Sequence, residues 1–281
     1  MTLVVEDERL LAPPAGRPEE RPAARRKISS RVVSGITIAL MLVLWAISAE
    51  LKLVSATFLP SPEAVAIKFV TVATTGYVDA TLLQHLAASL GRVFAALVFA
   101  ILVGIPMGLG IGLSTIGRGI FDPLLEFLRP IPPLAYLPLI IIWFGIGEPA
   151  KILVITIAMV APIALSTASG VRGVQQDRVN AARSFGASRI EVIRHVVVPS
   201  ALPSIITGLR IALGAGWTTL VAAELVAATR GLGFMIQSAA QFLVTDVVIM
   251  GIFVIAIVAF MLEFAIRKLE RVLVPWAGKE P

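Results

Sequence analysis

The sequence predicts an all-α polytopic membrane protein with six transmembrane helices. Three observations support this: the composition, the long charge-free segments and the placement of the basic residues. The chain of 281 residues is 57% hydrophobic and only 15% charged, with a mean hydropathy of +0.91. Soluble domains are about 45–50% apolar and about 25% charged. So much apolar surface favours a chain that lies in lipid, where helices satisfy their own backbone hydrogen bonds.

Charge-free segments predict where the helices cross. A helix needs about 20 apolar residues to span the hydrocarbon core, and the candidate segments here are each about 16–28 residues long. Arg210 is the one charged residue that interrupts them. The six segments are 31–50, 92–118, 129–148, 151–172, 195–224 and 246–263.

Basic residues predict the orientation, because cytoplasmic loops carry an excess of Lys and Arg. Most of the 24 basic residues fall on one side if both termini are cytoplasmic, among them Arg118, Arg129 and the arginines between 172 and 194. The polar segment after 172 is therefore expected in the cytoplasm. A cleaved signal peptide with Ala46 and Ser48 at its cleavage site is the alternative for the first apolar run.

The domain organisation follows from these segments. Ser61 and Pro62 are typical of a helix start and predict a short helix in the first outside loop. The predicted parts are a disordered basic cytoplasmic tail at 1–30, a first transmembrane helix at 31–54, an extracytoplasmic loop with that short helix at 55–90, a five-helix core at 91–272 and a cytoplasmic tail at 273–281.

Glycine and proline patterns mark two of the spans. Glycines at 104, 108 and 112 lie four residues apart, which lets a second helix backbone approach closely. Four prolines between 130 and 138 predict that the third span is bent or starts late. A kink that lines a pathway and a kink that serves packing both fit this pattern.

The composition also argues against several classes of function. With no cysteine and two histidines, the chain offers little for a metal site, and none is predicted. The basic residues lie at the ends of apolar runs, so nucleic-acid binding is not expected. No H-E-x-x-H motif or nucleophile elbow is present, so an intramembrane enzyme is disfavoured and no catalytic residue is assigned.

The polar segment 180–199, NAARSFGASRIEVIRHVVVP, is the most informative stretch of the chain. Gly186 suits the left-handed residue that ends a helix. Ser188 followed by Glu191 forms a capping box for a second helix, which should end before Pro199. The pattern predicts two short helices joined by a tight turn, which favours a docking element for a soluble partner over an ordinary cytoplasmic loop.

This segment resembles the Glu-Ala-Ala-x3-Gly-x9-Ile-x-Leu-Pro loop of ABC-importer permeases, the helix pair that sits in a cleft of the ATPase subunit. Asn180 departs from the pattern, since the family usually has Glu there, and a hydrogen bond from the amide could replace the ion pair. The resemblance implies a coupling loop at 176–199, with ATPase-coupling residues Asn180, Ala181, Ala182, Phe185, Gly186, Ala187, Ser188 and Pro199.

Three further stretches, 79–94, 129–148 and 208–235, resemble the sulfonate, taurine and nitrate branch of these permeases, and with 242–252 the chain is most similar to the taurine importers. The resemblance implies a type I ABC importer permease fold in the bacterial cytoplasmic (inner) membrane. It implies import of a small organic sulfonate, with taurine as the expected substrate and aliphatic sulfonates or nitrate as alternatives.

The same resemblance implies the partners. They are a second copy of the chain in a homodimer, two cytoplasmic ATPase subunits and an extracytoplasmic substrate-binding protein. No cofactor is expected in this chain, because ATP and Mg would be bound by the ATPase subunits. Consistent with this, the sequence has no G-x-x-x-x-G-K-[ST] phosphate loop.

Polar and ionisable residues within spans are candidates for the translocation pathway, because such groups are costly in lipid. Structural roles compete in each case: Glu224 can pair with Arg230 or Arg92, and a tryptophan at a helix centre often serves packing. The pathway candidates are Trp143, Trp217, Thr218, Thr219, Arg92, Arg210 and Glu224.

An ion-coupled secondary transporter is the main alternative of a different class. Such transporters usually place carboxylates near the membrane midplane to carry the coupling ion. Here the charged residues sit towards the ends of the predicted spans, and no inverted repeat is evident. The sequence therefore favours the ATP-driven importer.

Overall fold

The computed structural model describes residues 30–275, and every regular element in that range is a helix. The predicted tails, apart from residues 30 and 273–275, lie outside the described residues. The chain divides into two units, 1–44 and 45–281. The described part of the first unit is the amino-terminal portion of α1 (Ser30–Glu50), whose side chains are largely exposed. α1 ends four residues before the predicted boundary at 54.

Five helical stretches within the described residues are long and apolar enough to cross a membrane. A sixth crossing is made if a bent pair of helices counts as one, which gives the predicted number. The five are Val32–Glu50 in α1, Leu82–Leu113 (α3), Glu148–Arg172 (α6), Arg189–Val226 and Thr245–Leu273 (α11).

The third crossing differs from the prediction. It starts at Thr115 and consists of α4 (Thr115–Leu128), a short 3-10 turn at Pro133–Tyr136 and α5 (Leu137–Phe144), with a bend of 91° at the break. Prolines 130, 132 and 133 explain the break, since each removes a backbone donor and disfavours continued helix.

The prediction of a cytoplasmic loop at 118–129, between the second and third spans, was therefore wrong. Ser114 alone separates α3 from α4, and its hydroxyl accepts a hydrogen bond from the amide of Gly117 at 3.3 Å. The charges at 118, 122 and 126 lie on one face of α4, since residues four apart share a helix face. Arg129 consequently lies at the break inside the crossing, and not in a loop at its start.

The second crossing also starts earlier than predicted. Thr81 and Gln84 form a capping box, with the Thr81 amide donating to Gln84 Oε1 at 2.9 Å, so α3 begins at Leu82. Arg92, where the charge-free segment began, is a buried residue inside this helix. The end of the predicted outside loop is therefore helical.

The core packs α3, α6 and α9 (Val198–Ala227) against one another. A Cβ at Gly112 would lie 2.6 Å from the Cβ of Val171 on α6, and one at Gly104 would lie 3.0 Å from that of Ile163. The prediction that these glycines allow close helix packing is confirmed. Gly208 of α9 similarly approaches Ser166 of α6.

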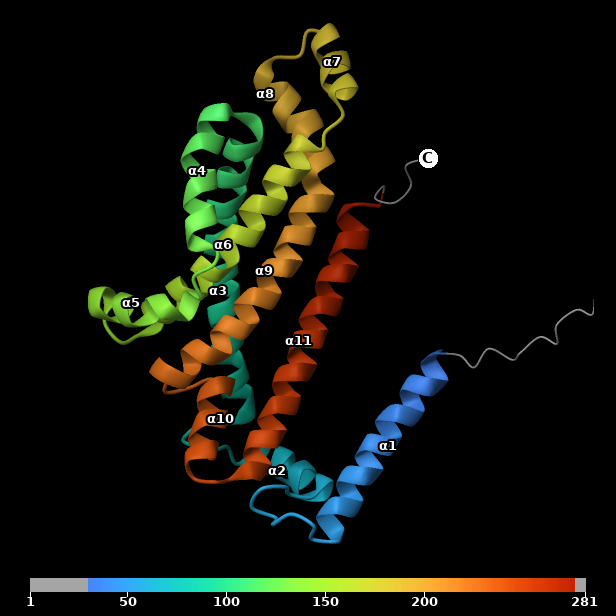
Figure 1. Ribbon diagram of the computed structural model, residues 1–281, viewed down its shortest axis with the longest axis vertical. Coiled ribbons are helices and arrows are strands. Elements are labelled where there is room, and N and C mark those ends of the chain that lie inside the picture. The colour runs from blue at the N-terminus through green and yellow to red at the C-terminus, as the bar shows by residue number, and fades with distance from the viewer. Residues whose placement is uncertain (1–29, 276–281) are drawn as a thin grey trace, which may run out of the picture. The chain divides into compact units, whose positions relative to one another are not determined.

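Short helices lie at both ends of the bundle formed by the second unit (Figure 1). α2 (Pro62–Thr74) begins at the predicted cap, since the Ser61 hydroxyl accepts from the amide of Ala64 at 3.2 Å. It packs against α11, as does α10 (Leu232–Gln241). α7 (Gln176–Ser184) and α8 (Arg189–Val192) lie at the opposite end.

Candidate functional site

The polar segment folds as two short helices joined by a tight turn. Gly186 adopts φ +83°, and its amide donates to the carbonyl of Arg183 at 2.9 Å. The amide of Ala187 donates to the carbonyl of Ala182 at 3.2 Å. These bonds satisfy carbonyls at the end of α7, where a residue with positive φ commonly closes a helix.

The second helix has the predicted capping box. The Ser188 amide donates to Glu191 Oε2 at 2.7 Å, and the Glu191 amide donates to the Ser188 hydroxyl at 3.4 Å. After α8 the chain continues without a break through a π-helical turn, Ile193–Val197, into α9. The helix pair is thus rigidly joined to a membrane-crossing helix, since helical hydrogen bonding continues across the junction.

The tip of this helix pair exposes apolar surface. The side chain of Phe185 is 92% exposed, and Ile190 is also exposed. A shallow hollow of about 330 Å³ lies beside Phe185, with Ala182, Gly186 and His195 among the residues that line it. An exposed aromatic residue next to a hollow, on an otherwise polar helix pair, is typical of a protein-binding surface.

Asn180 is exposed on α7, at the position where a glutamate was expected. Its Oδ1 accepts a hydrogen bond from Nε2 of Gln176 at 3.2 Å, and its carbonyl accepts from the Ser184 hydroxyl at 3.0 Å. The amide side chain is therefore held along its own helix by the preceding turn.

A buried polar network lies at the opposite end of the bundle, centred on Arg92 of α3. Its guanidinium donates two hydrogen bonds to Glu148 at the start of α6, at 2.6 and 2.8 Å. Its Nη1 donates to Glu224 of α9 at 2.5 Å and to the carbonyl of Arg230 at 2.7 Å. Lys151 adds a second cation, 2.8 Å from Glu148. Paired, bidentate contacts of this kind are the strong form of the ion pair.

Glu224 is fully buried, and all of its neighbours in the network donate to it. Besides Arg92, the Ser89 hydroxyl donates to it at 2.8 Å and the amide of Gly233 at 2.8 Å. His85 accepts from the amide of Gly231 at 3.1 Å. Since buried charges are stable only when paired and hydrogen-bonded, the network ties the ends of α3, α6 and α9 to the loop before α10.

The predicted pathway residues are not brought together at one place. Arg92 and Glu224 form the buried pair that the sequence allowed. Arg210 lies 3.9 Å from Glu263 and 3.7 Å from Glu270, both on α11. The role of the predicted pathway residues in translocation stays a prediction.

The two tryptophans occupy contrasting environments. Trp217 belongs to the apolar core, and among the described residues its indole nitrogen has no hydrogen-bond partner. Trp143 is exposed on α5. The structure therefore places Trp217 in a packing position, while Trp143 is available to a neighbour.

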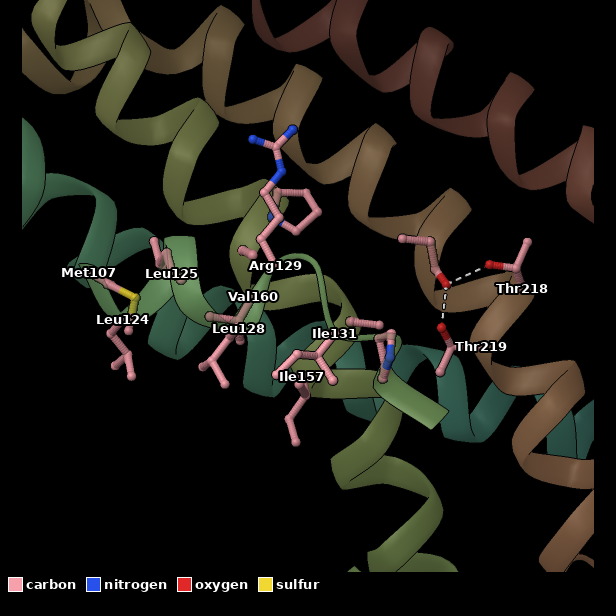
Figure 2. A pocket seen from close by; sticks show the side chains of 15 residues that line it. Met107, Leu124, Leu125, Leu128, Arg129, Ile131, Ile157, Val160, Thr218 and Thr219 are labelled. Carbon is pink, nitrogen blue, oxygen red and sulfur yellow. Dashed lines mark hydrogen bonds between the residues drawn. The ribbon is translucent and has the colours of Figure 1, made fainter. Parts of the chain in front are cut away.

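Thr218 and Thr219 line a cavity of about 390 Å³ formed by α3, α4, α6 and α9 (Figure 2). Most of its walls are apolar, with Met107, Leu128 and Ile157 among them. Arg129, at the end of α4, lines the same cavity. Sequence reasoning missed Arg129 because it assigned 118–129 to a loop, although the four-residue spacing of the charges at 118, 122 and 126 indicated a helix.

Long apolar helices, a buried charge network at one end and a protruding polar helix pair at the other define a subunit of a membrane transporter. The chain belongs to the family of binding-protein-dependent transport system inner membrane components, whose family model matches residues 100–274. It is thus a multi-pass membrane protein of a transport family.

The chain is similar to several curated permeases. It is 57% identical over 257 residues to the taurine transport system permease protein TauC of Escherichia coli (strain K12), covering 91% of this chain and 94% of that protein. It is 37% identical to the putative aliphatic sulfonates transport permease protein SsuC of the same organism, over 83% of this chain and 87% of that protein. The bicarbonate transport system permease protein CmpB of Synechococcus elongatus is 39% identical, over 70% of this chain and 71% of that protein.

Solved structures support the fold. The MetNI methionine ABC transporter, described in inward facing conformations, matches with a TM-score of 0.60 at 21% identity, covering 68% of this chain and 95% of that one. An amino acid ABC transporter crystallised with histidines matches with a TM-score of 0.56 at 20% identity, covering 74% and 94%. The predicted ABC importer permease fold is confirmed.

Proposed function

We propose that the chain is the membrane-spanning permease subunit of an ATP-driven importer for a small organic sulfonate, with taurine as the substrate. The observation that carries the proposal is the 57% identity to a taurine permease over nearly the full length of both chains. Identity to the aliphatic sulfonate and bicarbonate permeases is much lower, at 37% and 39%. Aliphatic sulfonates are therefore the less favoured substrates.

The working assembly contains two copies of this chain, two cytoplasmic ATPase subunits that bind ATP and Mg, and an extracytoplasmic binding protein that delivers the substrate. Membership of a binding-protein-dependent family supports the last of these partners. The exposed Phe185 and the hollow beside it support a soluble partner at the helix pair. On this proposal the chain itself performs no catalysis.

The coupling loop transmits the movement of the ATPase subunits to the spans. Residues 173–175 are a short link from α6 to α7, while α8 continues directly into α9. Closure of the ATPase pair on ATP would displace Phe185 and its helix pair, and with them the ends of α6 and α9. Such a two-state element lets the partner bias which side of the membrane the pathway opens to.

The buried network keeps the spans moving together. Separating Arg92 from Glu224 would leave a buried charge uncompensated, which typically costs about 3–5 kcal/mol. A displacement at the coupling loop therefore moves α3, α6 and α9 as one body, and does not pull their outer ends apart. Arg92 and Glu224 act in this proposal as structural ties of the moving unit.

The experiment is uptake by the reconstituted complex. The permease, its cognate ATPase and its binding protein are placed in proteoliposomes, and accumulation of radiolabelled taurine is measured with and without ATP. We expect taurine uptake that depends on ATP. An excess of unlabelled aliphatic sulfonate or nitrate should reduce this uptake only slightly. Uptake that needs no ATP and stops when a proton or sodium gradient is collapsed would instead identify an ion-coupled secondary transporter.

A further inference from the structure

His85 is fully buried in the first turn of α3, beside the charge network but outside its ion pairs. Its Nε2 lies 2.9 Å from the carbonyl oxygen of Tyr77, in the loop before α3, and its Nδ1 lies 3.1 Å from the amide nitrogen of Gly231, in the loop before α10. The ring of Phe234 on α10 lies next to it, with 6.5 Å between the ring centroids. One side chain thus joins two loops that are far apart in the sequence, where α10 packs beside α3 (Figure 1).

The two hydrogen-bond partners determine the protonation state of the ring. A backbone amide can only donate a hydrogen bond, and a backbone carbonyl can only accept one. Nδ1 of His85 must therefore be unprotonated to accept from Gly231, and Nε2 must carry the proton that it donates to Tyr77. Only the neutral imidazole satisfies both partners, because both nitrogens of the charged ring are donors.

The loop before α10 is held by acceptors of this kind. Three successive buried amides each donate to a buried side chain: Gly231 to His85, Leu232 to the Ser89 hydroxyl at 2.9 Å and Gly233 to Glu224 at 2.8 Å. Gly231 has φ +139°, and a Cβ there would overlap the carboxylate of Glu224, so the loop lies directly against the network. Protonation of His85 would leave the first of these amides buried without an acceptor, which is costly.

Protonation would also add a cation to a place where the carboxylates are already paired. The Glu224 and Glu148 side chains are bound by Arg92 and Lys151. α10 carries no titratable side chain. The titratable groups that the surrounding elements bring to this end of the bundle are Arg92 on α3, Glu224 on α9, Glu148 and Lys151 on α6, Arg230 before α10, Tyr77 and Asp79 before α3, and Lys68 of α2 with its partner Asp246 of α11.

We propose that His85 is a positioning residue whose neutral ring latches the loop before α10 to the start of α3, so that protonation of the ring releases the loop and slows transport. The proposal rests on the proposed function, in which α3 and α9 move as one body only while their ends are tied. In that orientation the latch lies at the outer end of the bundle and responds to the outside pH. Histidine is the side chain that changes charge between about pH 5 and 8, so transport should be fast at the upper end of this range and slow at the lower end.

The test measures taurine uptake by the complete reconstituted complex with the outside pH set to about 8 or about 5.5. We expect the parent to lose about fivefold or more of its uptake at the lower pH, the effect of leaving one buried amide without its acceptor. His85→Asn keeps an acceptor for Gly231 but takes up no proton, so its uptake should change by less than about twofold. The binding protein, the ATPase and Glu224 are the same in both complexes, so their own pH dependence cancels in the comparison.

His195→Asn is the matched control, because His195 is the other histidine of the chain and lies at the opposite end of the bundle. Whatever this change does to the level of uptake, it should keep the parent's ratio between the two pH values. His85→Gln presents an acceptor on a longer side chain and repeats the test if the asparagine variant does not insert. Equal ratios for the parent and the His85 variant, including no change in either, would overturn the proposal.

Hydrogen exchange separates this proposal from the proposed function, because it needs neither substrate nor transport. Exchange of the amides at 231–233 is followed by mass spectrometry in the purified permease–ATPase complex, for the parent and His85→Asn at both pH values. We expect equal exchange at about pH 8 and faster exchange in the parent at about pH 5.5, where the loop is released. That result would support the latch even if ATP-dependent taurine uptake fails. Exchange in the parent that is no faster than in the variant at the lower pH would overturn it.

Discussion

Glu224 illustrates how a carboxylate is kept inside a membrane-crossing helix. The side chain is fully buried, and the groups around it all donate: a guanidinium and a hydroxyl from α3 and an amide at the start of α10. Arg92 is in turn shared with Glu148 of α6. The charges are thus balanced only as a group, so each depends on the others remaining in place.

Removal of Arg92 should destabilise the protein strongly. Arg92→Met leaves the buried Glu224 without its cation, and breaking a buried pair in this way typically costs about 3–5 kcal/mol, while Glu148 is half exposed and keeps Lys151. We expect a clearly lower unfolding temperature in nanodiscs, followed by intrinsic tryptophan fluorescence. Lys68→Met is the control, because it breaks a partly exposed pair with Asp246 that is worth about 0–1 kcal/mol. Equal shifts for the two variants would contradict the structural role given to the network.

At the scale of the helical elements, Gly186 determines whether α7 and α8 can form their tight turn. Proline cannot adopt φ +83° and lacks the amide that donates to Arg183. Gly186→Pro should therefore lower ATP-dependent uptake by about tenfold or more, while the amount inserted in the membrane stays unchanged. Asparagine tolerates the left-handed region, so Gly186→Asn should retain most of the uptake. If the proline variant transports normally, the helix pair is not the coupling element.

The elements predicted correctly are those determined by local sequence. The helix starts at Ser61 and Ser188 and the turn at Gly186 depend on residues within one helical turn of each other, so spacing alone locates them. Charge-free length likewise locates α6 and α11. Both signals act over short distances and are therefore visible in a single sequence.

The elements predicted wrongly depend on tertiary contacts. α4 was assigned to a loop because charged residues were taken to end a span, whereas they occupy one face of a helix that is apolar elsewhere. Arg92 was taken as the charged residue at which the second span begins, whereas α9 and α6 supply carboxylates that allow it to be buried inside α3. The pairing of Ser89 with Glu224 joins residues far apart in sequence, and no local pattern indicates it.

At the scale of the whole molecule, the two ends of the second unit differ in chemistry. One end carries α7 and α8 with several arginines and the exposed Phe185, while the other carries α2, α10 and the buried network (Figure 1). An excess of basic residues marks the cytoplasmic side of a membrane protein. The proposed function requires this orientation, because ATP is hydrolysed in the cytoplasm and the binding protein delivers substrate from outside.

The absence of cysteine in the sequence allows this orientation to be tested with single introduced thiols. Phe185→Cys places a thiol at the exposed tip of the helix pair, and Glu63→Cys places one on the exposed face of α2. A membrane-impermeant maleimide should label residue 63, but not residue 185, in intact spheroplasts. In inside-out vesicles it should label residue 185 and not residue 63. The reverse pattern would put the helix pair outside the cell, where no ATPase subunit could reach it, and the importer mechanism would be excluded together with the cytoplasmic location of the termini.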